Sequence, residues 1–180
     1  MAFKIAALYQ FLSIENPLEL KQYLERELSA RGILGGLIIA KEGINGTISG
    51  RELDLKDAVQ IISQTFPSLE IKFSDAKSEP FPRLRIRVKS ELVTMGYPNV
   101  NPIKNRSGSY VDPLEWNKLI EDPEVIVIDT RNEYEISVGS FKNAVNPMTE
   151  SFKEFPAYIE SFDCPKDKKI AMYCTGTCLH

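Results

Sequence analysis

The stretch from Ile33 to Gly50, ILGGLIIAKEGINGTISG, holds two apolar runs separated by a segment rich in turn-forming residues. Ile33 to Ala40 is predicted to be a strand because it is short, apolar and contains β-branched residues. Lys41 to Gly46 carries glycine and asparagine, which favour a turn, and Thr47 to Ser49 is predicted to be the next strand. We therefore expect two neighbouring strands joined by a turn.

Strand and helix patterns alternate on both sides of this pair. Phe3 to Phe11 and Leu69 to Phe73 are apolar runs of strand length. A first helix is predicted to begin at the N-cap Asn16 and to end at Gly32. A second helix is predicted by apolar residues at helical spacing between Leu55 and Ile62. The resulting order, βαββαβ, is that of a ferredoxin-like α+β domain.

The segment from Arg83 to Lys89 alternates strictly between cationic and apolar residues. This period of two predicts a strand with one apolar face and one cationic face. With a rise of ~3.3 Å per residue, neighbouring cations on that face stand about 6–7 Å apart, which resembles the spacing of successive phosphates along one nucleic-acid strand. The candidate RNA contacts are Arg83, Arg85, Arg87 and Lys89. The alternative is a solvated face whose cations pair with acidic side chains.

A stretch rich in proline, glycine and asparagine then predicts a linker. We expect the ferredoxin-like domain over residues 1–95, the linker over 96–111 and a second domain over 112–180. Residues 1–111 carry 15 Lys/Arg against 12 Asp/Glu, whereas residues 112–180 carry 7 against 13. A polyanionic partner is therefore expected to meet the first domain.

The second domain is predicted to be α/β. Asp112 followed by Pro113 has the form of a helix start, and the helix would bury Trp116, Leu119 and Ile120. Val125 to Ile128 and Ile170 to Tyr173 are continuous apolar runs, typical of parallel strands covered on both faces.

Polar residues with possible chemical roles follow both apolar runs. Cys174 comes directly after the second run, where the strand end of an α/β sheet collects reactive groups. A loop of backbone N–H groups there would favour the nucleophilic thiolate, although a small buried cysteine in a turn is the plain structural alternative. Asp129 and Arg131 end the first run and would either bind an anion or hold the neighbouring loop as a buried ion pair.

Three cysteines, all after position 163, do not make a disulfide framework and fit a reducing compartment. Cys174 and Cys178 lack the further ligands of a zinc site, so no metal is expected. The amino terminus lacks the pattern of a signal peptide, and no apolar run approaches the ~18 residues of a membrane span. These features predict a cytoplasmic protein with no membrane partner.

Several motifs resemble a known protein family. VIDTRNEYE at residues 127–135 and KIAMYCTG at residues 169–176 resemble the rhodanese domain and its active-site loop. KEGINGTISG at residues 41–50 and LVTMG at residues 92–96 are more specific. Together they resemble the rhodanese-containing tRNA uridine hydroxylase family over nearly the whole chain.

This resemblance implies the oxygen-dependent conversion of the wobble uridine of tRNA to 5-hydroxyuridine. Cys174 would correspond to the essential cysteine of the family and would act on the ring as a covalent nucleophile. Asp129 and Arg131 would organise the loop, and the cationic strand would hold the anticodon arm. Molecular oxygen would be a co-substrate, and no bound cofactor is expected.

The active-site loop departs from the family pattern. The family reads Cys-Thr-Gly-Gly-Ile-Arg-Cys, whereas this chain reads Cys-Thr-Gly-Thr-Cys-Leu-His from Cys174 to His180. We therefore expect an incomplete rhodanese-like domain that exposes an apolar sheet face. Two alternatives to the hydroxylase remain: a sulfurtransferase that carries a persulfide on Cys174, and a non-catalytic tRNA-binding remnant.

Overall fold

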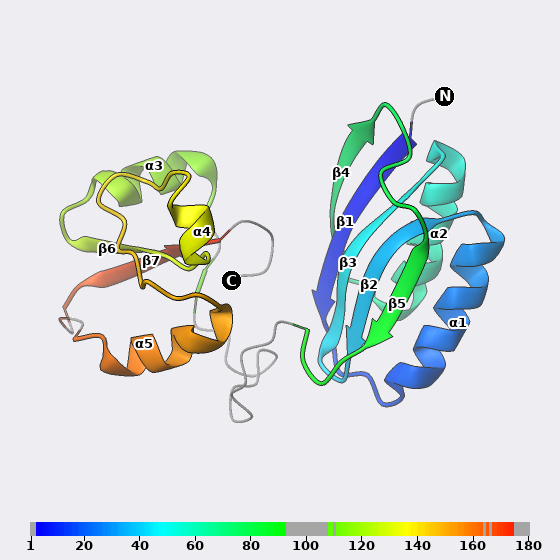
Figure 1. The fold of residues 1–180 in the computed structure, drawn as a ribbon, viewed down its shortest axis with the longest axis horizontal. Helices are drawn as coiled ribbons and strands as arrows, with labels where there is room; N and C mark the ends of the chain where they lie inside the picture. Colours follow the sequence, from blue (N-terminus) through cyan, green and yellow to red (C-terminus); the bar gives the residue numbers. More distant parts are fainter. Residues whose placement is uncertain (1–2, 93–107, 110, 164, 166, 175–180) are drawn as a thin grey trace. The chain divides into compact units, whose positions relative to one another are not determined.

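The structure is a computed structural model that describes residues 3–92, 108–109, 111–163, 165 and 167–174. Its described residues fall into two compact units, one up to Leu92 and the other from residue 108 onwards. Figure 1 shows both units, and each is described by itself below. Most of the expected linker, residues 96–107 and 110, lies outside the described residues.

The amino-terminal unit is a five-stranded sheet with two helices on one face (Figure 1). The strands lie in the order β4-β1-β3-β2-β5. The predicted βαββαβ order is confirmed, and β5 extends the sheet by pairing parallel to β2. The elements are β1 (Phe3–Phe11), α1 (Pro17–Ala30), β2 (Leu34–Ala40), β3 (Gly43–Gly50), α2 (Glu52–Thr65), β4 (Glu70–Ala76) and β5 (Leu84–Val88).

Helix α1 begins as its sequence predicts. The Asn16 side chain accepts a hydrogen bond from the backbone N–H of Glu19 at 3.2 Å and donates one to its carboxylate at 3.1 Å. Pro17 occupies the first turn, where its missing N–H has no helical partner to lose. The helix ends at Ala30, and Gly32 follows with a φ of 65° that favours glycine.

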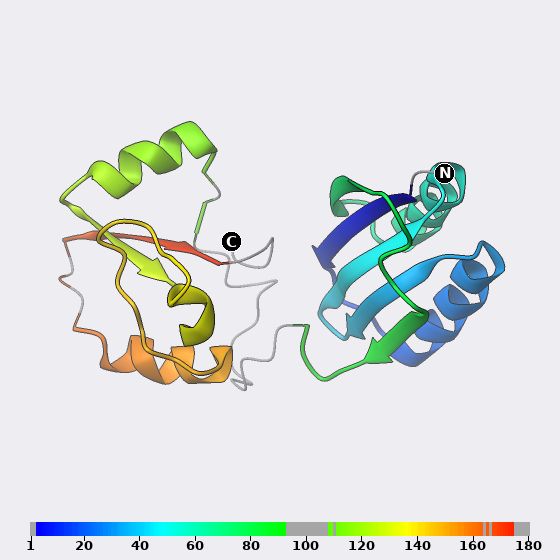
Figure 2. The same cartoon turned by 45° about the horizontal axis from the view of Figure 1, so that its top comes forward.

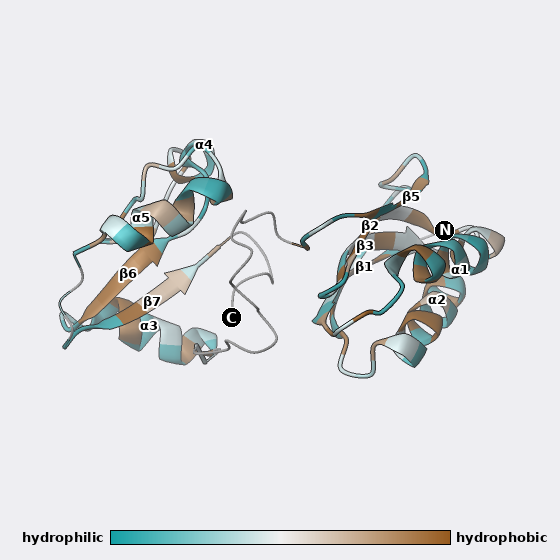
Figure 3. Cartoon of the chain, turned by 90° about the horizontal axis from the view of Figure 1, so that it is seen from below, coloured by the Kyte–Doolittle hydropathy of each residue, from teal (hydrophilic) through white to brown (hydrophobic). Residues whose placement is uncertain are grey.

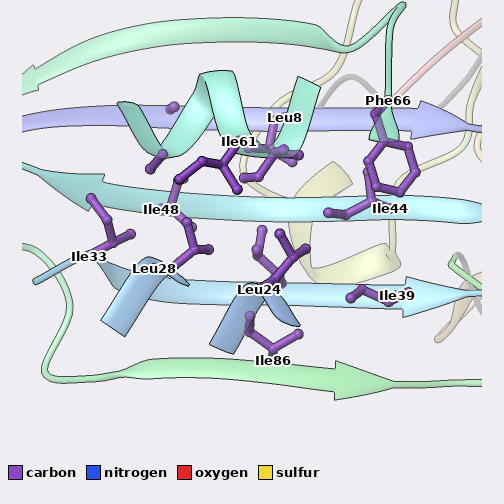
Figure 4. Packing of buried hydrophobic residues seen from close by; sticks show 14 of the residues in the cluster. Leu8, Leu24, Leu28, Ile33, Ile39, Ile44, Ile48, Ile61, Phe66 and Ile86 are labelled. Atoms are coloured by element: carbon purple, nitrogen blue, oxygen red, sulfur yellow. The ribbon is translucent and has the colours of Figure 1, made fainter. Parts of the chain in front are cut away.

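The core of this unit lies between the two helices and one face of the sheet (Figure 4). Leu24 and Leu28 of α1 and Ile62 of α2 are fully buried against aliphatic side chains of the strands. Removing each such side chain from water contributes about 1.5–3 kcal/mol to folding. The other buried members are Ala6, Leu8, Ile14, Ile33, Leu37, Ile39, Ile44, Ile48, Leu55, Ala58, Ile61, Phe66 and Ile86.

The turn between β2 and β3 is shorter than the sequence predicts. Strand β3 already begins at Gly43, so only Lys41 and Glu42 lie between the two strands. Gly43 has a φ of 143°, and a Cβ there would lie 2.0 Å from the carbonyl oxygen of Gln10 in β1. The glycine is therefore required by the close approach of β1, not by a turn.

Two of the family-like motifs meet in this unit. The Glu42 carboxylate accepts a hydrogen bond of 2.6 Å from the backbone N–H of Leu92, and the Leu92 side chain is buried. The two residues lie 50 positions apart in the chain. A hydrogen bond to a charged acceptor is stronger than a neutral one, so Glu42 fixes the end of the amino-terminal unit.

Adjacent glycines of β2 offer a test of this packing. Gly35→Ala is expected to destabilise the amino-terminal unit by about 2–3 kcal/mol, because its φ is 129° and the new Cβ would lie 2.3 Å from the Thr47 carbonyl oxygen. Gly36→Ala is the matched control, since its Cβ would approach nothing closer than 4.0 Å. Urea unfolding followed by far-ultraviolet circular dichroism measures both. Equal stability of the two variants would contradict the packing described here.

The carboxy-terminal unit contains a two-stranded parallel sheet of β6 and β7. Helix α3 lies on one side of this pair, and α4 and α5 lie on the other (Figures 2 and 3). Val145 adds an isolated parallel bridge to Ile128 of β6. The elements are α3 (Pro113–Glu121), β6 (Val125–Asp129), α4 (Glu133–Ile136), η1 (Phe152–Glu154), α5 (Phe155–Ser161) and β7 (Lys169–Tyr173).

Coverage of the two strands differs from the prediction. Val127 and Ile128 of β6 are buried, and Figure 3 shows this strand as hydrophobic along most of its length. In β7, Ala171 is buried but Ile170 and Met172 are 44% and 48% exposed. The prediction that β7 is covered on both faces is therefore wrong for the described structure, which instead agrees with the expected exposure of an apolar sheet face.

Helix α3 has the expected N-cap but is only half-buried. The Asp112 carboxylate accepts hydrogen bonds of 2.8 Å from the backbone N–H groups of Leu114 and Glu115. Trp116, Leu119 and Ile120 turn toward the unit, yet each remains half-buried rather than fully buried. The helix therefore covers its side of the small sheet incompletely.

Candidate active site

The parallel pairing of β6 and β7 brings the polar residues after both strands together. Asp129, the last residue of β6, is the register partner of Tyr173, the last residue of β7. Thr130 and Arg131 follow the first strand and Cys174 follows the second. Because the carboxyl ends of parallel strands meet at one edge, this is where an α/β sheet places reactive groups.

Asp129 is fully buried and accepts hydrogen bonds from several sides. One carboxylate oxygen accepts from Arg131 Nε at 2.9 Å and from the Arg131 backbone N–H at 3.2 Å. The other accepts from Arg131 Nη2 at 2.7 Å, from Ser140 Oγ at 2.9 Å and from the Tyr173 hydroxyl. Arg131 Nη2 also donates to the Gly139 carbonyl oxygen at 2.6 Å. The pair thereby fixes the segment after α4.

These contacts set the charge states of the cluster. Burial opposes ionisation of Asp129, but hydrogen bonds from Arg131, Tyr173 and Ser140 outweigh it and lower the pKa of the carboxyl to about 2. Burial raises the pKa of Tyr173, and the Asp129 carboxylate raises it further. At neutral pH the cluster therefore contains a carboxylate, a guanidinium and a protonated phenol that donates to the carboxylate.

Tyr173 connects this cluster to Cys174, the next residue. Its carbonyl oxygen accepts hydrogen bonds from the backbone N–H and the hydroxyl of Thr130 at 3.0 and 2.8 Å. Its ring meets those of Trp116 and Phe141 edge-on, with centroids 5.6 and 4.9 Å away. Its hydroxyl accepts from the Phe141 backbone N–H at 3.2 Å. Hydrogen bonds and ring packing thus fix the residue that precedes the thiol.

The predicted nucleophile Cys174 is half-buried at the end of β7. Its backbone follows directly from the residue that Thr130 and Asp129 hold. The expected cradle of backbone N–H groups would come from Thr175 and Gly176, which lie outside the described residues, as do Cys164 and Cys178. Cys174, Asp129 and Arg131 are therefore brought to one strand end, and the role of each residue stays a prediction.

The other predicted site residues lie in the amino-terminal unit. Arg83, Arg85, Arg87 and Lys89 are all exposed, and they flank or belong to β5. The alternation is confirmed at Leu84 and Ile86, which pack in the core, whereas Val88 is 42% exposed. RNA binding by these side chains stays a prediction.

Sequence reasoning assigned no role at the site to Ser140, Tyr173 or Trp116. A tyrosine before a cysteine at the end of an apolar run is typical of a strand, and its sequence gives no sign of a contact 44 residues away. Among the described residues no cluster of His, Cys, Asp and Glu is suited to a metal ion, and no helix there has the length and apolarity to cross a membrane.

Comparison with known proteins places both units in described families. Residues 3–92 match the UPF0176 acylphosphatase like domain, and residues 112–178 match the rhodanese-like domain. The first match covers 90 of the 180 residues, which is half of the chain.

Three similar proteins carry the name tRNA uridine(34) hydroxylase. The protein from Bartonella henselae is 46% identical over 97% of this chain, and that from Mesorhizobium japonicum is 45% identical over 96%. The protein from Synechocystis is 42% identical over 98%. The chain spans only 58%, 57% and 64% of the lengths of these three relatives, respectively. The chain therefore belongs to the family of the UPF0176 acylphosphatase like domain, here followed by a rhodanese-like domain.

Proposed function

We propose that this protein hydroxylates the wobble uridine of tRNA to 5-hydroxyuridine, with the thiolate of Cys174 as the nucleophile. The observation that carries the proposal is the similarity to proteins named tRNA uridine(34) hydroxylase, at 42–46% identity over 96–98% of the chain. The position of Cys174 after β7, beside the Asp129 cluster, supports the choice of nucleophile. A tRNA substrate also implies a cytoplasmic location.

The proposed chemistry replaces the C5–H bond of uracil with a C5–OH bond. Addition of the Cys174 thiolate to C6 makes C5 electron-rich, and expulsion of the thiolate after oxygen transfer restores the ring. Molecular oxygen supplies the hydroxyl oxygen. Its second atom leaves as water, which requires two electrons and two protons from an external reductant. The protein itself supplies the thiolate and holds the uracil ring next to it.

Asp129 and Arg131 act in this proposal as positioning residues. The Asp129 carboxylate accepts a hydrogen bond from the Tyr173 hydroxyl, and Arg131 lies over the Tyr173 ring with its Cζ 5.5 Å from the ring centroid. Both contacts fix the backbone that carries Cys174. The substrate uridine must leave the base stack of the anticodon loop to reach the thiol, as single-stranded bases do when proteins bind them.

Deletion of the gene tests the function directly. We expect tRNA nucleosides from the deletion strain to lack 5-hydroxyuridine by mass spectrometry, and we expect the wild-type gene on a plasmid to restore it. The deletion strain must also contain no other enzyme that makes 5-hydroxyuridine. A strain whose tRNA lacks this nucleoside before complementation meets that condition. Complementation that restores no 5-hydroxyuridine would contradict the proposed function.

A sulfurtransferase is the second candidate, supported by the rhodanese-like match and by a thiol at a strand end. In that reaction the thiolate breaks the S–S bond of thiosulfate, forms a persulfide and releases sulfite, and cyanide then removes the sulfur as thiocyanate. Thiocyanate production by the purified chain, but not by Cys174→Ser, would favour this reaction. Binding of tRNA without either activity would favour a non-catalytic module.

A further inference from the structure

The register of β2 and β5 separates the two faces of the cationic segment. Leu84, Ile86 and Val88 pair with Gly35, Leu37 and Ile39, whose side of the sheet faces α1 and α2. The alternate positions therefore face away from the helices. The four cations Arg83, Arg85, Arg87 and Lys89 occupy that open face, and all four are exposed.

Among the described residues these cations form no ion pair, whereas several cations on the helices do. Lys56 of α2 pairs with Glu52 at 2.8 Å, and on α1 Arg26 lies 3.1 Å from Glu27. Across the described ranges, no ion pair involves any of the four cations of the β5 segment. Like charges in a row are unfavourable unless an anion joins them. The described residues therefore show no ion pair that neutralises these four cations, and the Glu79 carboxylate on the same face accepts a hydrogen bond from Ser49 instead.

A flat row of small residues crosses the sheet beside Arg85. Gly36 of β2 pairs with Arg85, Thr47 of β3 pairs with Gly36, and Ala7 of β1 pairs with Thr47. Lys72 of β4, which is exposed, completes the row as the partner of Ala7. Two cations thus stand at opposite ends of a floor whose side chains are small.

We propose that this basic face, made of Arg83, Arg85, Arg87, Lys89 and Lys72 around Gly36, binds a single-stranded segment of RNA through its phosphates. The choice of tRNA as the source of that segment rests on the proposed function. Spacing favours one strand, because cations at alternate positions of β5 are about 6–7 Å apart from the strand rise. Sheet surfaces are known to bind unpaired RNA strands, and positive charge can follow the backbone of such a strand.

Salt dependence of binding tests the charges. Each phosphate contact on a single strand contributes about 0.7 to the slope of log K against log salt, so Arg85→Gln with Arg87→Gln should lower the slope by about 1.4. The same relation predicts roughly 25-fold weaker binding at 0.1 M salt. Fluorescence anisotropy of an unmodified tRNA transcript with the full chain measures both. The control, Arg26→Gln with Lys56→Gln, removes the same charge from the helices, and an equal loss in both pairs would overturn the proposal.

Gly36 offers a test that leaves the charge unchanged. Gly36→Val is expected to fold, because the nearest atom to a new Cβ is the Arg85 carbonyl oxygen at 4.0 Å, yet its side chain would rise from the floor. We expect weaker tRNA binding with an unaltered melting curve. Full affinity in a folded Gly36→Val protein would exclude contact with the floor, and equal competition by duplex RNA would exclude a single-strand site.

The two proposals fail in different ways. Binding that depends on the basic face, together with no 5-hydroxyuridine in the complemented strain, would remove the hydroxylase and leave the RNA surface standing. Formation of 5-hydroxyuridine at the wild-type level by Arg85→Gln with Arg87→Gln, with unchanged tRNA affinity, would remove the surface and leave the hydroxylase.

Discussion

Replacing Cys174 with serine is expected to lower the formation of 5-hydroxyuridine by on the order of 10³-fold or more, as loss of a covalent nucleophile does. Serine has nearly the same size, so the end of β7 keeps its packing. A serine hydroxyl is a far weaker nucleophile than a thiolate, which is the reactive form of cysteine. Mass spectrometry of tRNA nucleosides from a deletion strain that carries Cys174→Ser measures the loss.

Cys164→Ser provides the control for removal of a thiol elsewhere in the chain. We expect it to restore 5-hydroxyuridine, and we expect Cys174→Ser to retain tRNA binding because the basic face is unchanged. A wild-type level of 5-hydroxyuridine with Cys174→Ser would show that the thiol takes no part in the reaction. The hydroxylase would then need another nucleophile.

Replacing Asp129 with asparagine is expected to destabilise the carboxy-terminal unit by about 3–5 kcal/mol, the usual cost of removing one partner of a buried ion pair. The change leaves Arg131, whose side chain is 18% exposed, without its carboxylate. It also weakens the hydrogen bonds from Tyr173 and Ser140. The single tryptophan, Trp116, lies in this unit and packs on Tyr173, so its fluorescence in urea reports the unfolding of this unit.

Acid is expected to lower the stability of the carboxy-terminal unit in the wild-type protein as well. The pKa of Asp129 is lowered from 3.8 to about 2, so its contribution is present above pH 4 and disappears as the pH falls toward 2. A shift of this size corresponds to about 2 kcal/mol. Asp129→Asn should lack this acid-dependent loss, and exposed Glu121→Gln, in the same unit, should retain it. An Asp129→Asn protein that is as stable as the wild type at pH 7 would contradict the stabilising role of the Asp129–Arg131 pair.

Much of the amino-terminal fold follows from local signals in the sequence. Phe3–Phe11 is a strand as predicted, and the Asn16 cap begins α1 where expected. The first part of β3 was not predicted, because Gly43 and Gly46 look like turn residues. Glycine is required at these positions because neighbouring strands approach closely. In the sequence, glycines that serve this purpose look the same as glycines in a turn.

The candidate active site was less predictable. Apolar runs ending in Asp129 and before Cys174 indicated parallel strands, and parallel register then brought the two residues to one edge. The short helix α4 and the hydroxyl contacts of Ser140 and Tyr173 carry no such pattern. They depend on a chain path that returns from residue 140 to the strand ends, which local propensity does not encode.

Strand β5 stands at the margin of its sheet, with β2 on one side only. The edge strand of a sheet can pair with a strand from a second copy of the chain, and charged residues along an edge strand commonly prevent such pairing. If two copies paired through β5, their like-charged side chains would lie opposite one another. The residues proposed to attract RNA thus also discourage self-polymerisation of the protein.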